Sequence, residues 1–230
     1  MSEPGMTHIS LRTALILVVF TVAFTALMAL IYLATKAPIS QSAEEEKLKL
    51  IGAVLPPGSY DNALLQDSID IPPTAELGLN QASRIYRARK GGVPVALVLE
   101  AAAPDGYSGR IGLIIGLRVV PGIGLSPSAP PQPLDIIAVR VTEHRETPGL
   151  GDYIDPKKDK NKVKPWISQF DAISFAKITP DQWQVKKDGG QFEQRAGATI
   201  SARAVTRAVG RALQWADTHQ ALLLQPPPSR

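Results

Sequence analysis

The sequence of 230 residues contains no cysteine. This excludes iron–sulfur clusters held by thiolates, zinc ribbons and cysteine nucleophiles. Histidine is scarce as well, because the three residues His8, His144 and His219 lie far apart in the sequence. The stretch 143–146 (Glu-His-Arg-Glu) lacks the second histidine that a metalloprotease helix needs. We therefore predict that the chain holds no metal ion.

A strong excess of one charge is also absent. Lys and Arg together number 25 and Asp and Glu number 21, which gives a formal net charge of +4. Acidic and basic residues are interleaved, so the charge does not indicate a nucleic-acid partner. The lysines at 157–164 alternate with Asp159 and Asn161, and this pattern favours a solvated loop.

One long apolar run is present near the N-terminus, and residues 13–35 contain no charged side chain. As an α-helix this run would be about 34 Å long, which is enough to cross a hydrocarbon core with some tilt. A cleaved signal peptide usually has a shorter apolar region, and a core helix of this length would have a polar face. We predict a transmembrane helix here. The flanking charges, Arg12 on one side and Lys36 on the other, do not decide its orientation.

The remaining sequence predicts a single α+β domain, since about 195 residues suffice for one domain but not comfortably for two. Residues 38–55 indicate a membrane-proximal helix that ends at the Pro-Pro-Gly of 56–58. An amphipathic helix is predicted from about residue 200 to 219. Strand patterns occur at 83–89, 93–100, 109–120 and 134–142, with a further short strand ending in a turn at 185–190. Strands in meander order with helices at the ends indicate one antiparallel sheet.

These elements divide the chain into five segments. A Pro-, Gly- and Ser-rich loop is expected at 121–133 within the main domain, and the three prolines near the C-terminus indicate a disordered tail. The segments are an N-terminal tail (1–12), the transmembrane helix (13–35), a membrane-proximal helix and linker (36–82), the main domain (83–224) and the C-terminal tail (225–230).

Thr199, at the start of the last helix, is the main candidate site residue. Three small residues at 196–198 precede it, so its hydroxyl would lie at a helix N-terminus with free backbone N–H groups. Those groups and the helix dipole favour an anion such as a phosphate ester. Arg195 and Arg203 could neutralise the remaining phosphate charge. Taken alone, a Gly-Ala-Thr stretch before a helix is usually just an ordinary N-cap.

Several short motifs follow the apolar N-terminal segment in a distinctive order. They are Asp-Gly-Tyr-Ser-Gly-Arg-Ile at 105–111, His-Arg-Glu-Thr-Pro-Gly-Leu-Gly at 144–151, Trp-Ile-x-x-Phe at 166–170, Lys-Lys-Asp-Gly-Gly at 186–190 and Gly-Ala-Thr at 197–199. Through these motifs nearly the whole chain resembles the FMN-binding domain family, in particular the RnfG component of Rnf electron-transport complexes. The flavin-carrying C component of the sodium-translocating NADH:quinone reductase is a related family.

The resemblance implies that FMN is bound covalently to Thr199. In this family a flavin transferase joins the FMN phosphate to the last threonine of an Asp-x-x-Ser/Thr-Gly-Ala-Thr motif. Ala196, Gly197 and Ala198 would then lie beside the cofactor. Two positions depart from the motif, because Glu193 replaces the aspartate and Ala196 replaces the hydroxyl residue.

The turn that follows Glu146 is the second candidate site. Thr147 offers a hydroxyl, Gly149 and Gly151 would let the backbone approach a flat ring, and Leu150 could cover one face of the flavin. A tight turn with a purely structural role is the alternative. We expect the Tyr-Ser-Gly of 107–109 to shape the sheet near the ring, and Trp166 to be a core residue.

The resemblance further implies an electron-relay component of an ion-translocating oxidoreductase in the bacterial inner membrane, with its C-terminal domain on the periplasmic side. Electrons would pass between nicotinamide nucleotide and ferredoxin branches, and the partners would be other Rnf proteins, a flavin transferase and the bilayer. No residue suggests a catalytic acid, base or nucleophile for substrate turnover. The alternatives are the C component of the quinone reductase, a flavin-free structural tether, and an extracytoplasmic solute-binding module.

Overall fold

A computed structural model of the chain describes residues 6–119 and 133–225. The chain forms two units, of which the first ends at Lys47 and the second begins at Leu48. Most of the predicted loop at 121–133, and the predicted tail from residue 226 onward, lie outside the described residues.

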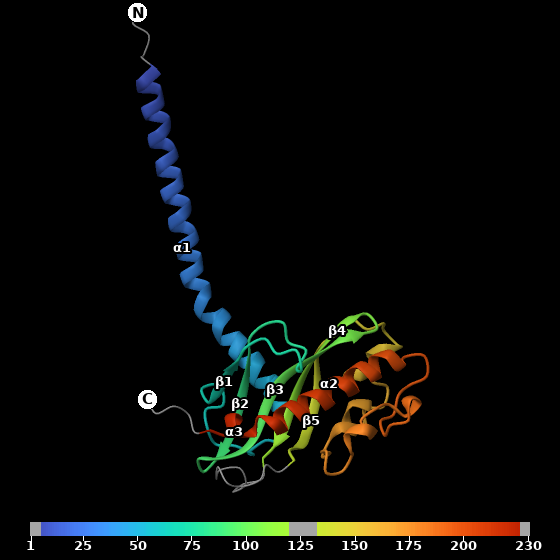
Figure 1. Cartoon of the computed structure of the whole chain (residues 1–230). Coiled ribbons are helices and arrows are strands. Elements are labelled where there is room, and N and C mark those ends of the chain that lie inside the picture. Colours follow the sequence, from blue (N-terminus) through green and yellow to red (C-terminus); the bar gives the residue numbers. More distant parts are fainter. Residues whose placement is uncertain (1–5, 120–132, 226–230) are drawn as a thin grey trace, which may run out of the picture. The chain divides into compact units, whose positions relative to one another are not determined.

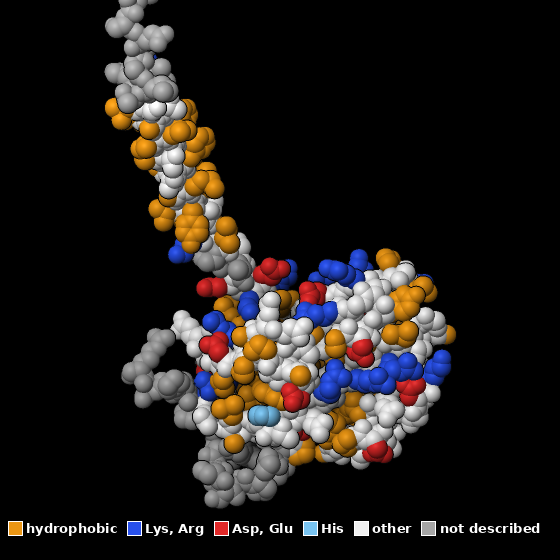
Figure 2. Space-filling model, turned by 45° about the horizontal axis from the view of Figure 1, so that its top comes forward, with side chains coloured by type: hydrophobic (Ala, Val, Ile, Leu, Met, Phe, Trp, Pro, Cys, Tyr) orange, Lys and Arg blue, Asp and Glu red, His pale blue; other side chains and the backbone are white. Residues whose placement is uncertain are grey.

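Helix α1 runs without interruption from Met6 to Gly52 (Figure 1). Its segment Ser10–Lys36 has a mean hydropathy of 2.8, and it is long and apolar enough to cross a membrane. Apolar side chains cover the visible face of this segment (Figure 2), and none of it is buried against other parts of the described chain. The hydroxyls of Thr21 and Thr35 donate to backbone carbonyls one turn earlier, at 2.8 Å each, so they need no water. The helix therefore has the surface of a lipid-exposed span rather than of a core helix.

The two helices predicted at 13–35 and 38–55 are parts of one continuous helix, because α1 continues through Pro38 to Gly52. It also begins at Met6, inside the segment 1–12 that we expected to be a tail. Good helix formers after Pro38, among them the glutamates at 44–46, extend the helix. The chain leaves the helix at Gly52, and Pro56 and Pro57 prevent its return.

The second unit is built on a five-stranded antiparallel sheet in the order β1-β2-β3-β4-β5 (Figure 1). The predicted meander is confirmed. The strands are β1 (Ser68–Ile71), β2 (Ser83–Lys90), β3 (Val93–Gly106), β4 (Gly109–Arg118) and β5 (Asp135–Glu143). Strand β1 lies in the segment that we assigned to a linker, and with four residues it is too short to give a clear pattern.

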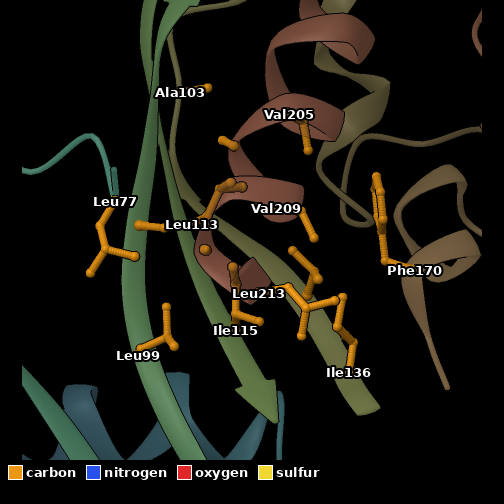
Figure 3. Close-up of a cluster of buried hydrophobic side chains, with 14 of the residues drawn as sticks. Leu77, Leu99, Ala103, Leu113, Ile115, Ile136, Phe170, Val205, Val209 and Leu213 are labelled. Carbon is orange, nitrogen blue, oxygen red and sulfur yellow. The ribbon is translucent and has the colours of Figure 1, made fainter. Parts of the chain in front are cut away.

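Both faces of the sheet are covered. On one face, helix α2 (Thr199–Thr218) packs against β3. Its Val205, Val209 and Leu213 belong to one buried cluster with Leu99, Leu113 and Ile115 of the sheet (Figure 3). The spacing of four residues between the three α2 side chains places them on one side of the helix, as the amphipathic pattern predicts. On the other face, a second cluster joins the end of α1 to the sheet; it includes Ile51, Val54, Leu55, Leu64, Tyr86, Val98 and Ile114.

Four short 3₁₀ helices connect β5 to α2, namely η1 (Gly151–Ile154), η2 (Trp166–Phe170), η3 (Pro180–Gln182) and η4 (Lys186–Asp188). The short strand predicted at 185–190 is wrong, because Val185 forms only an isolated bridge and Gly189 turns the chain with φ +90°. Aromatic rings pack this region together, and Trp166, which is 8% exposed, is a core residue as predicted. A one-turn helix α3 (Gln220–Leu223) ends the described chain.

Candidate functional site

Thr199 is the first residue of α2 and is half-buried. The N-cap position belongs to Ala198, and among the residues that the structure describes no side chain caps this helix. The first turn also contains no acidic residue. The N–H groups at this end therefore lack a side-chain partner and carry partial positive charge. This geometry fits an anion next to the Thr199 hydroxyl, and it does not support the N-cap alternative.

The turn before the helix needs a glycine. Gly197 has φ +82°, and the space that a Cβ atom would enter is open. Ala196 and Gly197 are exposed, whereas Ala198 is buried at 8% exposure. The Ala198 N–H donates to the carbonyl of Arg195 at 3.2 Å and closes the turn. The small residues thus leave one side of the turn accessible to a bulky group.

The Tyr153 hydroxyl holds this turn through two hydrogen bonds. Tyr153 was not among the residues predicted from the sequence. Its hydroxyl accepts the backbone N–H of Arg195 at 3.2 Å and donates to the carbonyl of Ala198 at 3.3 Å. The ring is 2% exposed, and this burial raises the pKa of the Tyr153 hydroxyl above its ordinary value. The hydroxyl therefore remains protonated and keeps donating. Tyr153 lies in a four-residue 3₁₀ helix, which has no periodic pattern to find.

The two arginines expected to neutralise a phosphate are paired with carboxylates instead. Arg195 donates to Asp159, and its guanidinium lies 4.6 Å from the centre of the Tyr153 ring. Arg203 donates from Nε and Nη2 to the two carboxylate oxygens of Asp188, at 2.6 and 2.7 Å. Both guanidinium groups therefore already have a carboxylate partner within the chain.

The prediction of a solvated loop at 157–164 is wrong for one residue, Asp159. The lysines of this loop are exposed, but Asp159 is fully buried. Burial alone would raise its pKa, yet the N–H groups of Trp166 and Asn161 and the guanidinium of Arg195 outweigh this, and the pKa of Asp159 is lowered. An ionised Asp159 therefore ties the loop to the segment that precedes Thr199.

The turn at 147–151 is held by its own backbone. The N–H groups of Leu150 and Gly151 both donate to the Thr147 carbonyl at 3.1 Å. Thr147, Gly149 and Leu150 are exposed, and Gly149 has φ +76° with open space beside it. Gly151 is buried, and a Cβ atom there would lie 2.6 Å from Oε2 of Glu146. Packing against Glu146 is thus a reason for glycine at position 151 that the sequence did not indicate.

Glu146 joins three motif segments that are far apart in the sequence. Its Oε2 accepts the Ser201 hydroxyl at 2.6 Å, and its Oε1 accepts the Ser108 N–H at 3.2 Å. Glu146 itself is 4% exposed. The turn between β3 and β4, the turn at 147–151 and the first turn of α2 therefore meet at one carboxylate. In the sequence Glu146 stands out only as the start of a turn, because a contact across 55 residues leaves no local pattern.

Each of these three segments also presents a large exposed apolar side chain. Tyr107, Leu150 and Ile200 are 67%, 55% and 45% exposed, and each directly adjoins a residue that contacts Glu146. An uncapped helix N-terminus with apolar side chains around it suits a ligand that combines a phosphate with a flat apolar ring. The residues present therefore fit FMN, as the sequence resemblance implies.

Glu193, one of the two positions that depart from the family motif, is held by several hydrogen bonds. The backbone of Glu193 accepts the indole N–H of Trp166 at 2.6 Å and donates to Oε1 of Gln169 at 2.8 Å. Its carboxylate pairs with Lys186 at the surface. Trp166, Gln169, Glu193 and Arg195 border a pocket of about 330 Å³. The longer side chain of Glu193 is thus accommodated without disturbing the turn.

Comparison with known proteins gives two family matches. An FMN-binding domain matches residues 132–214, and an RnfG N-terminal region matches residues 6–54. Relatives named as the G component of the ion-translocating oxidoreductase complex align over most of the chain. The protein from Pseudoalteromonas atlantica is 40% identical, covering 89% of this chain and 86% of its own. The protein from Pseudomonas aeruginosa is 39% identical, covering 94% of this chain and 92% of its own. The protein from Vibrio atlanticus is 38% identical, covering 94% of each chain.

Proposed function

The chain belongs to the RnfG family, the G component of ion-translocating oxidoreductase complexes, and from that premise we propose that it carries FMN through a phosphoester at Thr199. It is a membrane-anchored member of such a complex with an FMN-binding domain, and the other proteins of the complex are its expected partners. In the proposed role it relays electrons within the complex, between nicotinamide nucleotide and ferredoxin branches, from the periplasmic side of the bacterial inner membrane.

The observation that carries this proposal is the position of the Thr199 hydroxyl. It lies at the first residue of a helix whose N-terminus no described side chain caps, next to a turn with an accessible side. Attachment forms the bond between Thr199 Oγ1 and phosphorus. A phosphoanhydride bond of a flavin dinucleotide donor breaks, a nucleoside monophosphate leaves, and the threonine proton passes to a base of a flavin transferase. The helix N-terminus then stabilises the negative charge that remains on the phosphodiester.

When bound, FMN supplies the electron-transfer chemistry, and the protein supplies attachment, orientation and surroundings. Covalent attachment prevents loss of the cofactor in a compartment where free flavin is dilute. Thr147, Gly149 and Leu150 lie on the exposed turn that Glu146 links to α2, so they are proposed to contact the flavin. Ala196, Gly197 and Ala198 leave room for it. No catalytic acid or base of the chain itself is proposed.

A denaturing gel viewed under ultraviolet light tests the attachment. The full chain is produced together with its flavin transferase, as wild type, Thr199→Val and Thr206→Val. Thr206 is a matched control, because it lies on the same helix, is buried, and its hydroxyl has no hydrogen-bond partner within the described chain. We expect fluorescent bands for wild type and Thr206→Val, and a dark band for Thr199→Val.

A dark wild-type band would support the flavin-free tether instead. Fluorescence that is lost on denaturation would indicate a reversibly bound ligand, as in a solute-binding module. A fluorescent Thr199→Val band would place the flavin on a different residue.

A further inference from the structure

We propose that Glu146 is the positioning residue of the flavin site. It determines how the protein holds the flavin ring after the phosphate has been attached to Thr199. This inference rests on the proposed function. It concerns the segments around the cofactor rather than the acceptor hydroxyl, and Glu146 itself is 4% exposed and does not face solvent.

The hydrogen bonds of Glu146 define its role. A buried carboxylate is costly unless donors satisfy its oxygens, and each oxygen of Glu146 has one. The Ser201 hydroxyl, in the first turn of α2, donates to Oε2 at 2.6 Å. The Ser108 N–H, in the turn between β3 and β4, donates to Oε1 at 3.2 Å. The carboxylate therefore links its own turn to two other segments.

The space around the carboxylate is closed. A Cβ atom at Gly106 would lie 2.8 Å from Oε1, and one at Gly151 would lie 2.6 Å from Oε2. Glycine at these two positions leaves room for the carboxylate and nothing larger. Glu146 consequently cannot shift by much without breaking a hydrogen bond, and the three segments are held in one arrangement.

Three residues that contact Glu146 are each preceded in the sequence by a residue with an exposed apolar side chain. Tyr107 precedes Ser108, Leu150 precedes Gly151, and Ile200 precedes Ser201. Their side chains are 67%, 55% and 45% exposed, so each of the three segments that meet at Glu146 carries an accessible apolar side chain. Glu146 therefore fixes the surface on which the ring can rest, without touching the ring.

Attachment and positioning depend on different contacts. The acceptor turn at 195–198 is held by the Tyr153 hydroxyl, and neither of its hydrogen bonds involves Glu146. Truncation of Glu146 should thus leave Thr199 able to accept the flavin, while the ring loses its fixed surroundings. This separation allows a failure of the inference to be distinguished from a failure of the proposed function.

The test uses the full chain in detergent, produced with its transferase, as wild type, Glu146→Ala, Glu146→Gln and Glu143→Ala. Glu143 is the matched control, because it lies three residues earlier and pairs at the surface with Arg110. Intact mass reports attachment. Fluorescence anisotropy, visible circular dichroism and the midpoint potential of the flavin, all measured below the melting transition, report its surroundings.

We expect all four proteins to carry the flavin mass. Glu146→Ala should show lower anisotropy, a weaker visible dichroism and a shifted potential. Glu146→Gln should restore them, because the amide oxygen still accepts the Ser108 N–H and the amide nitrogen can donate to the Ser201 hydroxyl. Glu143→Ala should equal wild type.

A folded Glu146→Ala protein with wild-type anisotropy, dichroism and potential would overturn the inference and leave the attachment intact. A wild-type chain without flavin mass would overturn the proposed function instead, and the positioning role with it. If Glu146→Ala does not fold, the same measurements are made on Ser201→Ala. This variant removes only the hydrogen bond between Glu146 and the first turn of α2. Wild-type flavin properties in Ser201→Ala would then contradict the inference, and a partial loss of anisotropy would support it.

Discussion

Tyr153 contacts both ends of the turn that precedes Thr199, through one hydroxyl that accepts from Arg195 and donates to Ala198. Asp159 acts on the same turn through the side chain of Arg195. Neither residue is near Thr199 in the sequence, yet both determine where its hydroxyl lies. At the residue scale, the site thus depends on buried polar side chains that support an exposed acceptor turn.

Tyr153→Phe should lower the free energy of unfolding by about 1–3 kcal/mol, because it leaves the Arg195 N–H and the buried Ala198 carbonyl without this partner. It should also reduce the fraction of chains that carry flavin, since the acceptor turn loses its support. Urea unfolding and intact mass measure the two effects. Unchanged stability with full flavin occupancy would show that the hydroxyl does not hold the turn.

Asp159→Asn should change the pH dependence of stability. The folded pKa of Asp159 is lowered, so its carboxylate stabilises the fold above the unfolded value near pH ~4 and loses this effect as the pH falls through the folded value. The variant should lose about 1–3 kcal/mol at neutral pH and show a shallower decline in acid. Urea unfolding at pH 7 and across the acid range checks both. An unchanged acid decline would contradict the ion pair with Arg195.

At the element scale, long periodic segments were predictable and short ones were not. The sequence predicts β2, β4, β5 and α2 to within two residues, because strand and helix patterns extend over eight or more residues. For β3 it predicts the start, but the strand runs six residues beyond the predicted end at residue 100. Strand β1 and the 3₁₀ helices have three to five residues each, too few for a pattern. At 185–190, where a short strand was predicted, Val185 forms only an isolated bridge with Phe192.

In the candidate site, too, local features were predictable from the sequence and long-range contacts were not. Thr199 and the turn at 147–151 were identified through motifs, which are local. Glu146 and Tyr153 were missed as supporting residues, because their contacts cross 55 and 42 residues and form only in the folded domain. Arg195 and Arg203 were assigned to a phosphate because their carboxylate partners, Asp159 and Asp188, could not be identified from spacing.

Gly197→Ala should disturb the acceptor turn. Gly197 has φ +82°, and a non-glycine residue in this region costs about 1–2 kcal/mol. Gly91→Ala is the matched control, because Gly91 has φ +58° and equally open surroundings in the turn between β2 and β3. Thermal or urea unfolding should show similar losses for both variants, whereas intact mass should show less flavin only in Gly197→Ala. Equal flavin occupancy would mean that the turn geometry is not needed for attachment.

At the scale of the whole molecule, the chain combines a lipid-exposed helical segment with a domain that has a core on both faces of its sheet. The absence of cysteine makes the natural chain a clean background for site-directed labelling. Lys187 is exposed in the domain, and Ser2 precedes the apolar segment.

Single cysteines at Lys187→Cys and Ser2→Cys test the proposed topology. A membrane-impermeant maleimide applied to spheroplasts should label the cysteine at position 187. The cysteine at position 2 should react only after the membrane is permeabilised, because the N-terminal tail is proposed to face the cytoplasm. The reverse pattern would place the domain on the cytoplasmic side.

The intact mass of the chain purified from its native membrane tests the central claim most directly. We predict a mass above that of the amino-acid sequence by FMN less one water, located by fragmentation on the peptide that contains Thr199. A native chain that weighs no more than its sequence, or one whose flavin lies on another residue, would contradict the account.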